Sequence, residues 1–233
     1  MGPALSAAHR RRLREVWRSA GWPCKDLIEL DLLAEGYVKR NWDEQGRETL
    51  RVTESGIALL ADTRQRNRSA RDAHETLVQR VAEEMQRAGR VVWRGLSLRA
   101  PLAADDGGTS WVMTMPDVFS IRHTTAEDYV EPVVHEIKVS RADLMSDLSR
   151  QAKGQAYLAL SSQCWYVLKR GIAQEQDIPA SFGLIVADDS GLEVLRPAPR
   201  RPQRLAFDTW MALARATPEP WPEASPQAAL GPV

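Results

Sequence analysis

Two acidic residues and one lysine interrupt apolar, strand-like segments in the middle of the chain. Asp117 follows Pro116 and precedes the run VFSI, whereas Glu136 and Lys138 lie within the run PVVHEIKVS at 132–140. A carboxylate in a buried strand costs several kcal/mol unless it is paired or bound to a metal ion. Carboxylate oxygens are also the ligands that Mg²⁺ and Mn²⁺ prefer, and such an ion activates water and neutralises phosphate charge. These residue types therefore indicate metal-assisted phosphodiester hydrolysis, in which Lys138 would orient or help to deprotonate the attacking water.

The three side chains meet only if their two strands pair in one particular register. We expect residues 111–122 and 131–140 to form an antiparallel pair whose facing residue numbers sum to 253, which places Asp117 opposite Glu136. Lys138 lies two residues beyond Glu136 and therefore shares its face of the sheet. The same alternation turns His135 to the opposite face, where we expect it to be packed rather than to bind a ligand. A purely structural Asp–Lys or Glu–Lys ion pair at a sheet edge is the alternative interpretation.

The elements that must position these residues follow an order typical of an α/β sandwich. An amphipathic helix is expected at 74–88, where Leu77, Val78 and Val81 belong to one apolar stripe. Strands are expected at 91–98, 111–122, 132–140, 164–169, 181–188 and 192–196, with a long helix at 141–160 that Ser140 would cap. This order predicts an α/β fold with a mixed central sheet.

Pro116-Asp117, 18 intervening residues and Glu136-Ile137-Lys138 resemble the PD-(D/E)XK nuclease superfamily, over about residues 72–196. The resemblance implies a restriction-endonuclease-like αβββαβ core, a divalent-metal site and phosphodiester hydrolysis. It also implies that Asp117, Glu136 and the carbonyl of Ile137 bind Mg²⁺ or Mn²⁺, and that Lys138 is the catalytic lysine. Glu75 matches the position in the first core helix where many members carry another acidic residue, although a solvated surface position suits it equally.

The segment HEIKVSRADLMSDLSRQAKGQAY is similar to the MmcB-type branch of DNA-repair proteins. The matching positions are Ser140, Asp143, Asp147, Lys153 and Tyr157, whereas Leu144 stands where an aromatic residue is usual. Lys153 and Tyr157 are four residues apart on one helix face and could jointly hold a scissile phosphate. The alternatives are a solvated lysine over a half-buried tyrosine, and an Asp143 that serves only as a helix cap.

The N-terminal segment has a different pattern of elements. Helices are expected at 6–20 and 25–35, then two strands joined by a turn at 43–46, then a helix that Thr53 would cap. This order resembles a winged helix-turn-helix of the MarR type. Arg40, Arg47 and Arg51 on the wing could contact a DNA backbone. The second helix is acidic, however, so a protein-contact or dimerisation role remains open beside DNA binding.

Charge and composition divide the chain further. Residues 1–71 carry 14 Lys and Arg against 10 Asp and Glu, and the whole chain is formally neutral, which excludes an overall basic nucleic-acid coat. We expect a winged-helix domain at 1–68 and a nuclease-like domain at 69–200. A C-terminal helix at 201–216 and a disordered, proline-rich tail at 217–233 would follow.

These observations predict a Mg²⁺- or Mn²⁺-dependent nuclease, a hydrolase of phosphodiester bonds in DNA, that acts in DNA repair or in genome or mobile-element defence. A non-catalytic winged-helix regulator with a degenerate nuclease-like domain, or a docking subunit of a DNA-processing complex, is the alternative. DNA is the expected partner, a homodimer or a repair or defence complex is possible, and no membrane partner is expected. The long apolar run of a membrane span is missing, so a cytoplasmic, bacterial or phage-type intracellular protein is expected.

Overall fold

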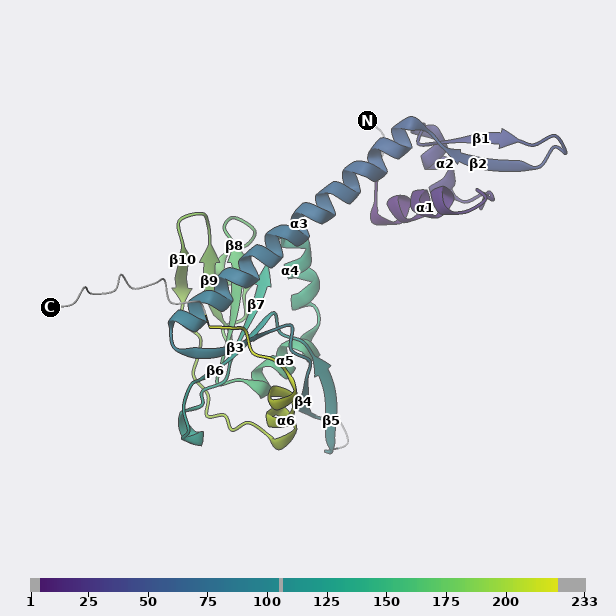
Figure 1. The fold of residues 1–233 in the computed structure, drawn as a ribbon. Helices are drawn as coiled ribbons and strands as arrows, with labels where there is room; N and C mark the ends of the chain where they lie inside the picture. The colour runs from purple at the N-terminus through teal and green to yellow at the C-terminus, as the bar shows by residue number, and fades with distance from the viewer. Residues whose placement is uncertain (1–4, 105–106, 222–233) are drawn as a thin grey trace. The chain divides into compact units, whose positions relative to one another are not determined.

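The computed structural model describes residues 5–104 and 107–221, and the chain divides into two compact units, residues 1–71 and 72–233 (Figure 1). One helix, α3 (Glu54–Arg87), is continuous across this division. The helices expected after Thr53 and at 74–88 are therefore a single element. None of the helices in the described ranges combines the length and the apolar composition that a membrane span requires.

The first unit contains two short helices and a hairpin before α3. The elements are α1 (Ala7–Arg18), α2 (Leu27–Ala34), β1 (Val38–Trp42) and β2 (Glu48–Val52). The side chains of Ser6 and Asp26 accept hydrogen bonds from main-chain N–H groups in the first turns of α1 and α2, so both helices begin at a capping residue. The predicted order of helix, helix, hairpin and helix is confirmed, and its core consists of Leu13, Val16, Leu32, Val38 and Leu50.

Gly21 anchors the hairpin to the segment between α1 and α2. Its carbonyl accepts a hydrogen bond from the Leu50 N–H at 2.6 Å. Gly21 has a φ of +77°, and a Cβ atom there would lie 2.1 Å from the Leu50 carbonyl oxygen. Only glycine fits this combination of backbone conformation and close approach.

The second unit is built on a six-stranded sheet with the order β10-β9-β8-β7-β6-β3. The strands are β3 (Arg90–Arg94), β6 (Val118–Arg122), β7 (Val133–Lys138), β8 (Gln163–Lys169), β9 (Gly183–Ala187) and β10 (Leu192–Arg196). β7, β8 and β9 are parallel, whereas β3, β6 and β7 are antiparallel, as are β9 and β10. The expected α/β class with a mixed central sheet is confirmed.

Helices cover both faces of this sheet (Figure 1). Leu77, Val78 and Val81 of α3 pack on one face, in a cluster that includes Ile137 and Val167. The other face is covered by α4 (Arg141–Leu148), α5 (Gln151–Leu160) and α6 (Phe207–Arg215), together with a two-stranded sheet of β4 (Leu98–Ala103) and β5 (Thr109–Thr114). Because side chains alternate along β7, Ile137 faces α3 while its neighbours face α4 and α5.

Three predicted elements are interrupted. The expected strand 91–98 ends at Arg94 in β3, and Leu98 begins β4 in the two-stranded sheet. The expected strand 111–122 is divided into β5 and β6, which belong to different sheets, because Pro116 fixes its own φ and has no N–H to continue a ladder. The expected helix 141–160 is divided into α4 and α5, since Arg150 has the non-helical angles φ −92° and ψ 72°. Short 3₁₀ helices at Glu127–Tyr129 and Glu175–Asp177 lie in loops.

The prediction of a disordered tail is wrong for its first residues. The Glu219 N–H donates a hydrogen bond to the Val92 carbonyl at 2.8 Å, and the Glu219 carboxylate pairs with Arg94 at 2.8 Å. β3 is the edge strand of the sheet and offers a carbonyl without a strand partner, which this segment satisfies. Residues 222–233 of the expected tail lie outside the described residues.

Candidate active site

The β6–β7 ladder has the predicted register. Val118 pairs with His135, Phe119 with Val134 and Ser120 with Val133, so the paired numbers sum to 253. Asp117 lies immediately before β6, and its Oδ2 accepts a hydrogen bond from the Ile137 N–H at 2.7 Å. The carboxylate is therefore held at the β7 segment that carries Glu136 and Lys138.

Glu136 and Lys138 form a buried ion pair. Their exposed fractions are 3% and 5%, and Lys138 Nζ lies 2.7 Å from Glu136 Oε1. The two side chains thus share one face of β7, as predicted. Lys138 Nζ also lies 3.4 Å from an oxygen of Asp143 and 3.6 Å from an oxygen of Asp147.

α4 and α5 bring a second ammonium and a third carboxylate to the same place. Lys153 Nζ lies 2.6 Å from Glu136 Oε1 and 2.5 Å from Asp147 Oδ1. Asp147 is buried, and the Tyr166 hydroxyl donates a hydrogen bond to its Oδ2 at 3.0 Å. The sequence pattern indicated Asp147 only through the resemblance. The sequence signal for its position is that Asp147 lies three residues after Leu144 and therefore on the same, buried side of α4.

Lys153 and Tyr157 share one side of α5 and both reach the site. Lys153 Nζ lies 5.2 Å from the centre of the Tyr157 ring, and its ion pairs show that it is not a free, solvated lysine. Tyr157 is buried, and its hydroxyl donates a hydrogen bond to the Met115 carbonyl at 3.2 Å. Burial and the neighbouring Glu136 carboxylate raise the pKa of Tyr157, so the hydroxyl remains a donor.

The structure places His74, rather than Glu75, beside Asp117. His74 Nε2 lies 3.4 Å from Asp117 Oδ2, whereas the Glu75 side chain is 65% exposed and its recorded ion pair is with His74. Asp117 raises the pKa of His74, with burial opposing the shift. The helical period explains why His74 rather than Glu75 contacts Asp117. His74 shares the inward face of α3 with Leu77 and Val78, whereas Glu75 is turned about 100° away.

Local charges fix the protonation of Lys138. Burial alone would lower the pKa of its ammonium, but Glu136, Asp147 and Asp143 raise it above the ordinary value. Burial and the nearby Asp117 carboxylate raise the pKa of Glu136, and the two lysines oppose that rise. Lys138 in this arrangement can donate a hydrogen bond or stabilise negative charge, but it is poorly suited to accept a proton.

The donor set fits a hard divalent cation with an open coordination sphere. Glu136 Oε2 is buried and has no hydrogen-bond partner among the described residues, although Oε1 of the same carboxylate accepts from two lysines. In residues 5–104 and 107–221, no group of three or more His, Cys, Asp or Glu side chains is arranged to hold a metal ion. Mg²⁺ commonly uses only one or two carboxylates and completes its sphere with water and substrate oxygens. Ligation by the Ile137 carbonyl stays a prediction.

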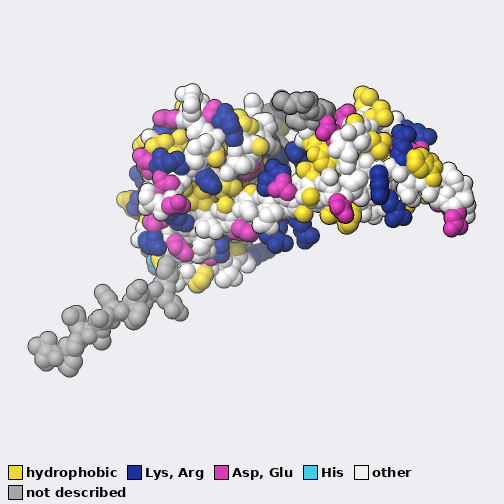
Figure 2. Space-filling model, turned by 90° about the horizontal axis from the view of Figure 1, so that it is seen from above, with side chains coloured by type: hydrophobic (Ala, Val, Ile, Leu, Met, Phe, Trp, Pro, Cys, Tyr) yellow, Lys and Arg dark blue, Asp and Glu magenta, His cyan; other side chains and the backbone are white. Residues whose placement is uncertain are grey.

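The hairpin arginines do not form a free basic surface. Arg40 pairs with Glu48 at 3.0 Å and Arg47 pairs with Asp43 at 2.7 Å, and Arg51 lies exposed on β2. Opposite charges are also interspersed over the face drawn in Figure 2. DNA contact through these three residues stays a prediction.

Comparisons with known proteins assign no function. The chain matches no protein-family model and no curated protein. Among solved structures, it is similar to a protein of unknown function from Silicibacter pomeroyi, with 26% sequence identity and a TM-score of 0.40. The similarity covers 58% of this chain and 76% of that chain.

Proposed function

We propose that the protein is a divalent-metal-dependent nuclease of the PD-(D/E)XK type that hydrolyses phosphodiester bonds in DNA. The observation that carries the proposal is the meeting of Asp117, Glu136 and Lys138, with one buried Glu136 oxygen left without a partner. A buried carboxylate oxygen in that condition is unfavourable unless a cation or donor reaches it. DNA repair or defence against mobile elements is the proposed setting, and the MmcB-type pattern from Ser140 to Tyr157 supports it.

The arrangement of elements supports the corresponding fold assignments. α3, the antiparallel strands β3, β6 and β7, the helices α4 and α5, and the parallel strand β8 follow the order of a restriction-endonuclease-like core. The order of α1, α2, the β1–β2 hairpin and α3 supports a winged helix in the first unit.

In this proposal Asp117 and Glu136 would hold Mg²⁺ or Mn²⁺, with the Ile137 carbonyl as a further ligand. The ion, when bound, supplies a water of lowered pKa and neutralises charge on the phosphate. Lys138, which keeps its proton, donates a hydrogen bond to the attacking water or to a phosphate oxygen. His74 positions the Asp117 carboxylate.

Lys153 is the residue suited to bind the scissile phosphate. Its side chain is 26% exposed, whereas its two carboxylate partners are buried, so the ammonium is the part of the cluster that substrate can reach. A bound cation at Glu136 would weaken the hold of that carboxylate on Lys153, which would free the ammonium for a phosphate oxygen. Tyr157 supports this position by packing beneath the ammonium.

A cleavage assay tests the proposal. Supercoiled, linear and single-stranded DNA are incubated with Mg²⁺ or Mn²⁺ and the purified chain, and the variants are Asp117→Asn, Lys138→Met and Glu75→Gln. We expect the first two to lose at least about 100-fold in rate, as when a charge-stabilising group is removed. Glu75→Gln is the matched control and should retain activity, because its side chain is exposed. Cleavage that survives both of the first two changes would refute the proposal.

A further inference from the structure

Unit 1 (residues 1–71) carries a group of arginines that the hairpin does not include. They are Arg10 on α1 and Arg64, Arg68 and Arg71 on α3, and none has a carboxylate partner within the described residues. Arg40 and Arg47 of the hairpin, by contrast, are each neutralised by an acidic neighbour. Apart from Arg51 on β2, the arginines of unit 1 that lack a carboxylate partner within the described residues lie on α1 and α3.

A pocket of about 250 Å³ opens between these two helices. Its lining consists of Arg10, Thr63, Arg66 and Asn67. The Thr63 Oγ1 atom is buried and has no hydrogen-bond partner in the part of the chain that the structure describes, although a hydroxyl can donate a hydrogen bond. Arg66 is held by an ion pair with Asp62 on the preceding turn. Arg10, which has no carboxylate partner within the described residues, supplies the positive charge of this lining. The Asn67 amide, the Thr63 hydroxyl and the Arg66 guanidinium, although the last is paired with Asp62, add hydrogen-bond donors, and such a lining suits a tetrahedral oxyanion.

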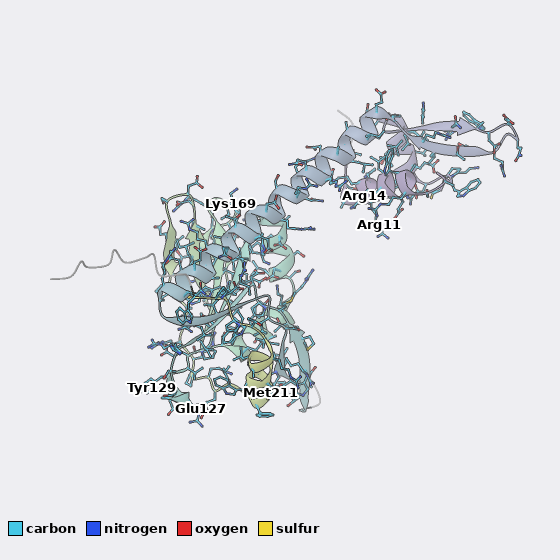
Figure 3. All side chains as sticks on the ribbon, in the orientation of Figure 1. Arg11, Arg14, Glu127, Tyr129, Lys169 and Met211 are labelled. Carbon is cyan, nitrogen blue, oxygen red and sulfur yellow. The ribbon has the colours of Figure 1, made fainter. Side chains whose placement is uncertain are left out.

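The remaining arginines on α3 form a row of their own. Arg64, Arg68 and Arg71 lie at intervals of four and three residues on one side of α3, which corresponds to steps of about 6 Å and 4.5 Å along the helix. Like charges at this spacing repel each other, so the row is more stable when an anion spans it. Arg14 is a further exposed arginine on α1, whereas its neighbour Arg11 pairs with Glu15 at 3.1 Å; Figure 3 labels both arginines. A linear series of cations matches a linear polyanion better than a single phosphate group.

We propose that the pocket binds one backbone phosphate of DNA and that the row on α3 binds neighbouring phosphates. Unit 1 would then hold DNA by the surface of α1 and α3, and neither the acidic helix α2 nor the β1–β2 hairpin is the main contact. The inference deepens the proposed function and rests on it for the choice of DNA as ligand. The inference concerns only the binding that does not depend on DNA sequence, because phosphate contacts position a protein without reading bases.

The experiment measures binding of the full chain to a fluorescein-labelled random-sequence duplex by anisotropy, in EDTA and over a series of salt concentrations. The pocket variant is Arg10→Gln with Arg66→Gln, and the row variant is Arg64→Gln with Arg68→Gln. The matched control is Arg40→Gln with Arg51→Gln, which removes the same number of positive charges from the hairpin. Thr63→Val tests the unpartnered hydroxyl with almost no change of shape.

We expect the pocket and row variants each to lose about 10-fold in affinity. The slope of log K against log salt should fall by about 0.9 for each phosphate that the variant no longer neutralises. The hairpin variant should stay within about twofold of the parent chain, because its arginines neutralise few phosphates in this arrangement. Thr63→Val should weaken binding measurably without changing the salt slope.

Three results would overturn the inference. They are equal affinities for all the variants, a loss confined to the hairpin variant, and binding to phosphatidylglycerol vesicles in place of the duplex. Because EDTA excludes cleavage, binding and hydrolysis are measured separately. A chain that binds in the expected pattern but never cleaves DNA with Mg²⁺ refutes the proposed function and leaves this inference standing.

Discussion

The Asp117 carboxylate accepts a hydrogen bond from the main-chain N–H of Ile137, with 2.7 Å between Oδ2 and N. This contact extends the β6–β7 association beyond the end pair of the ladder, Val118 and His135, at the position next to Pro116. A side chain thereby replaces the main chain where the ladder ends, and it leaves an acidic group beside Glu136. Asp117 consequently both holds the end of the β6–β7 pair together and is a candidate ligand for a metal ion.

Removal of the Glu136 charge should abolish the response of the protein to Mn²⁺. Glu136→Gln also takes a carboxylate partner from Lys138 and Lys153, so we expect it to lower the Tm in EDTA, as measured by circular dichroism. Mn²⁺ should raise the Tm of the parent chain and leave that of the variant unchanged, because ligand binding stabilises only the state that binds it. Equal responses to Mn²⁺ would argue against Glu136 as a ligand.

Asp147 should be important for the stability of the protein as well as for the position of Lys153. Its replacement by Ala removes one of the two carboxylates that pair with Lys153 and leaves the Tyr166 hydroxyl without that acceptor, and loss of one member of a buried ion pair costs about 3 kcal/mol. Tyr166→Phe removes only one hydrogen bond and should cost about 1 kcal/mol. Urea unfolding of both variants gives the comparison. If Tyr166→Phe were as damaging as Asp147→Ala, the lysine contact would have little energetic value.

His74 should affect catalysis and Glu75 should not. His74 contacts Asp117, so His74→Ala frees the carboxylate to move and should lower kcat by about 10-fold, in line with the cost of a small misplacement. Glu75→Ala changes an exposed side chain and should stay close to the parent rate. The ratio of the two rates under Mg²⁺ is the measurement. Similar losses in both variants would remove the distinction between them.

His135 should make stability depend on pH. Burial lowers its pKa to about 3, with Arg90 adding to the shift, so the folded protein keeps the ring neutral while the unfolded chain takes up a proton. The stabilisation is present above the ordinary value of about 6.5 and is lost as pH falls from there toward 3. His135→Phe retains a ring against Trp165 and should flatten this part of the stability profile relative to the parent chain. If the stability profiles of the parent chain and the variant ran parallel between about pH 6.5 and pH 4, the pH dependence could not be assigned to His135.

The main features of the site follow from local sequence rules. Alternation along β7 placed Glu136 and Lys138 together, and the strand register placed Asp117 beside them. The helical period also identifies His74, because His74 lies three and four residues before the apolar residues Leu77 and Val78. The resemblance indicates Glu75 instead, since it does not specify which of two neighbouring residues points inward.

Other features depend on contacts that local rules do not contain. The apolar pattern of residues 141–160 continues across Arg150, so the division into α4 and α5 is decided by packing on the sheet. Glu219 reaches β3 across more than a hundred residues of sequence, and proline content alone indicated disorder there. Pro116 was a local signal for the break between β5 and β6, but the surrounding apolar run masked it.

The crowded carboxylates around Lys138 and Lys153 have a practical consequence for anyone engineering this protein. Because Glu136 and Asp147 each pair with two ammonium groups, a library screened only for heat tolerance will retain both acids for stability alone. Their presence among the stable survivors would then say nothing about the ability of those survivors to do chemistry. Selection should therefore score turnover from the first round and leave thermal improvement to residues remote from β7.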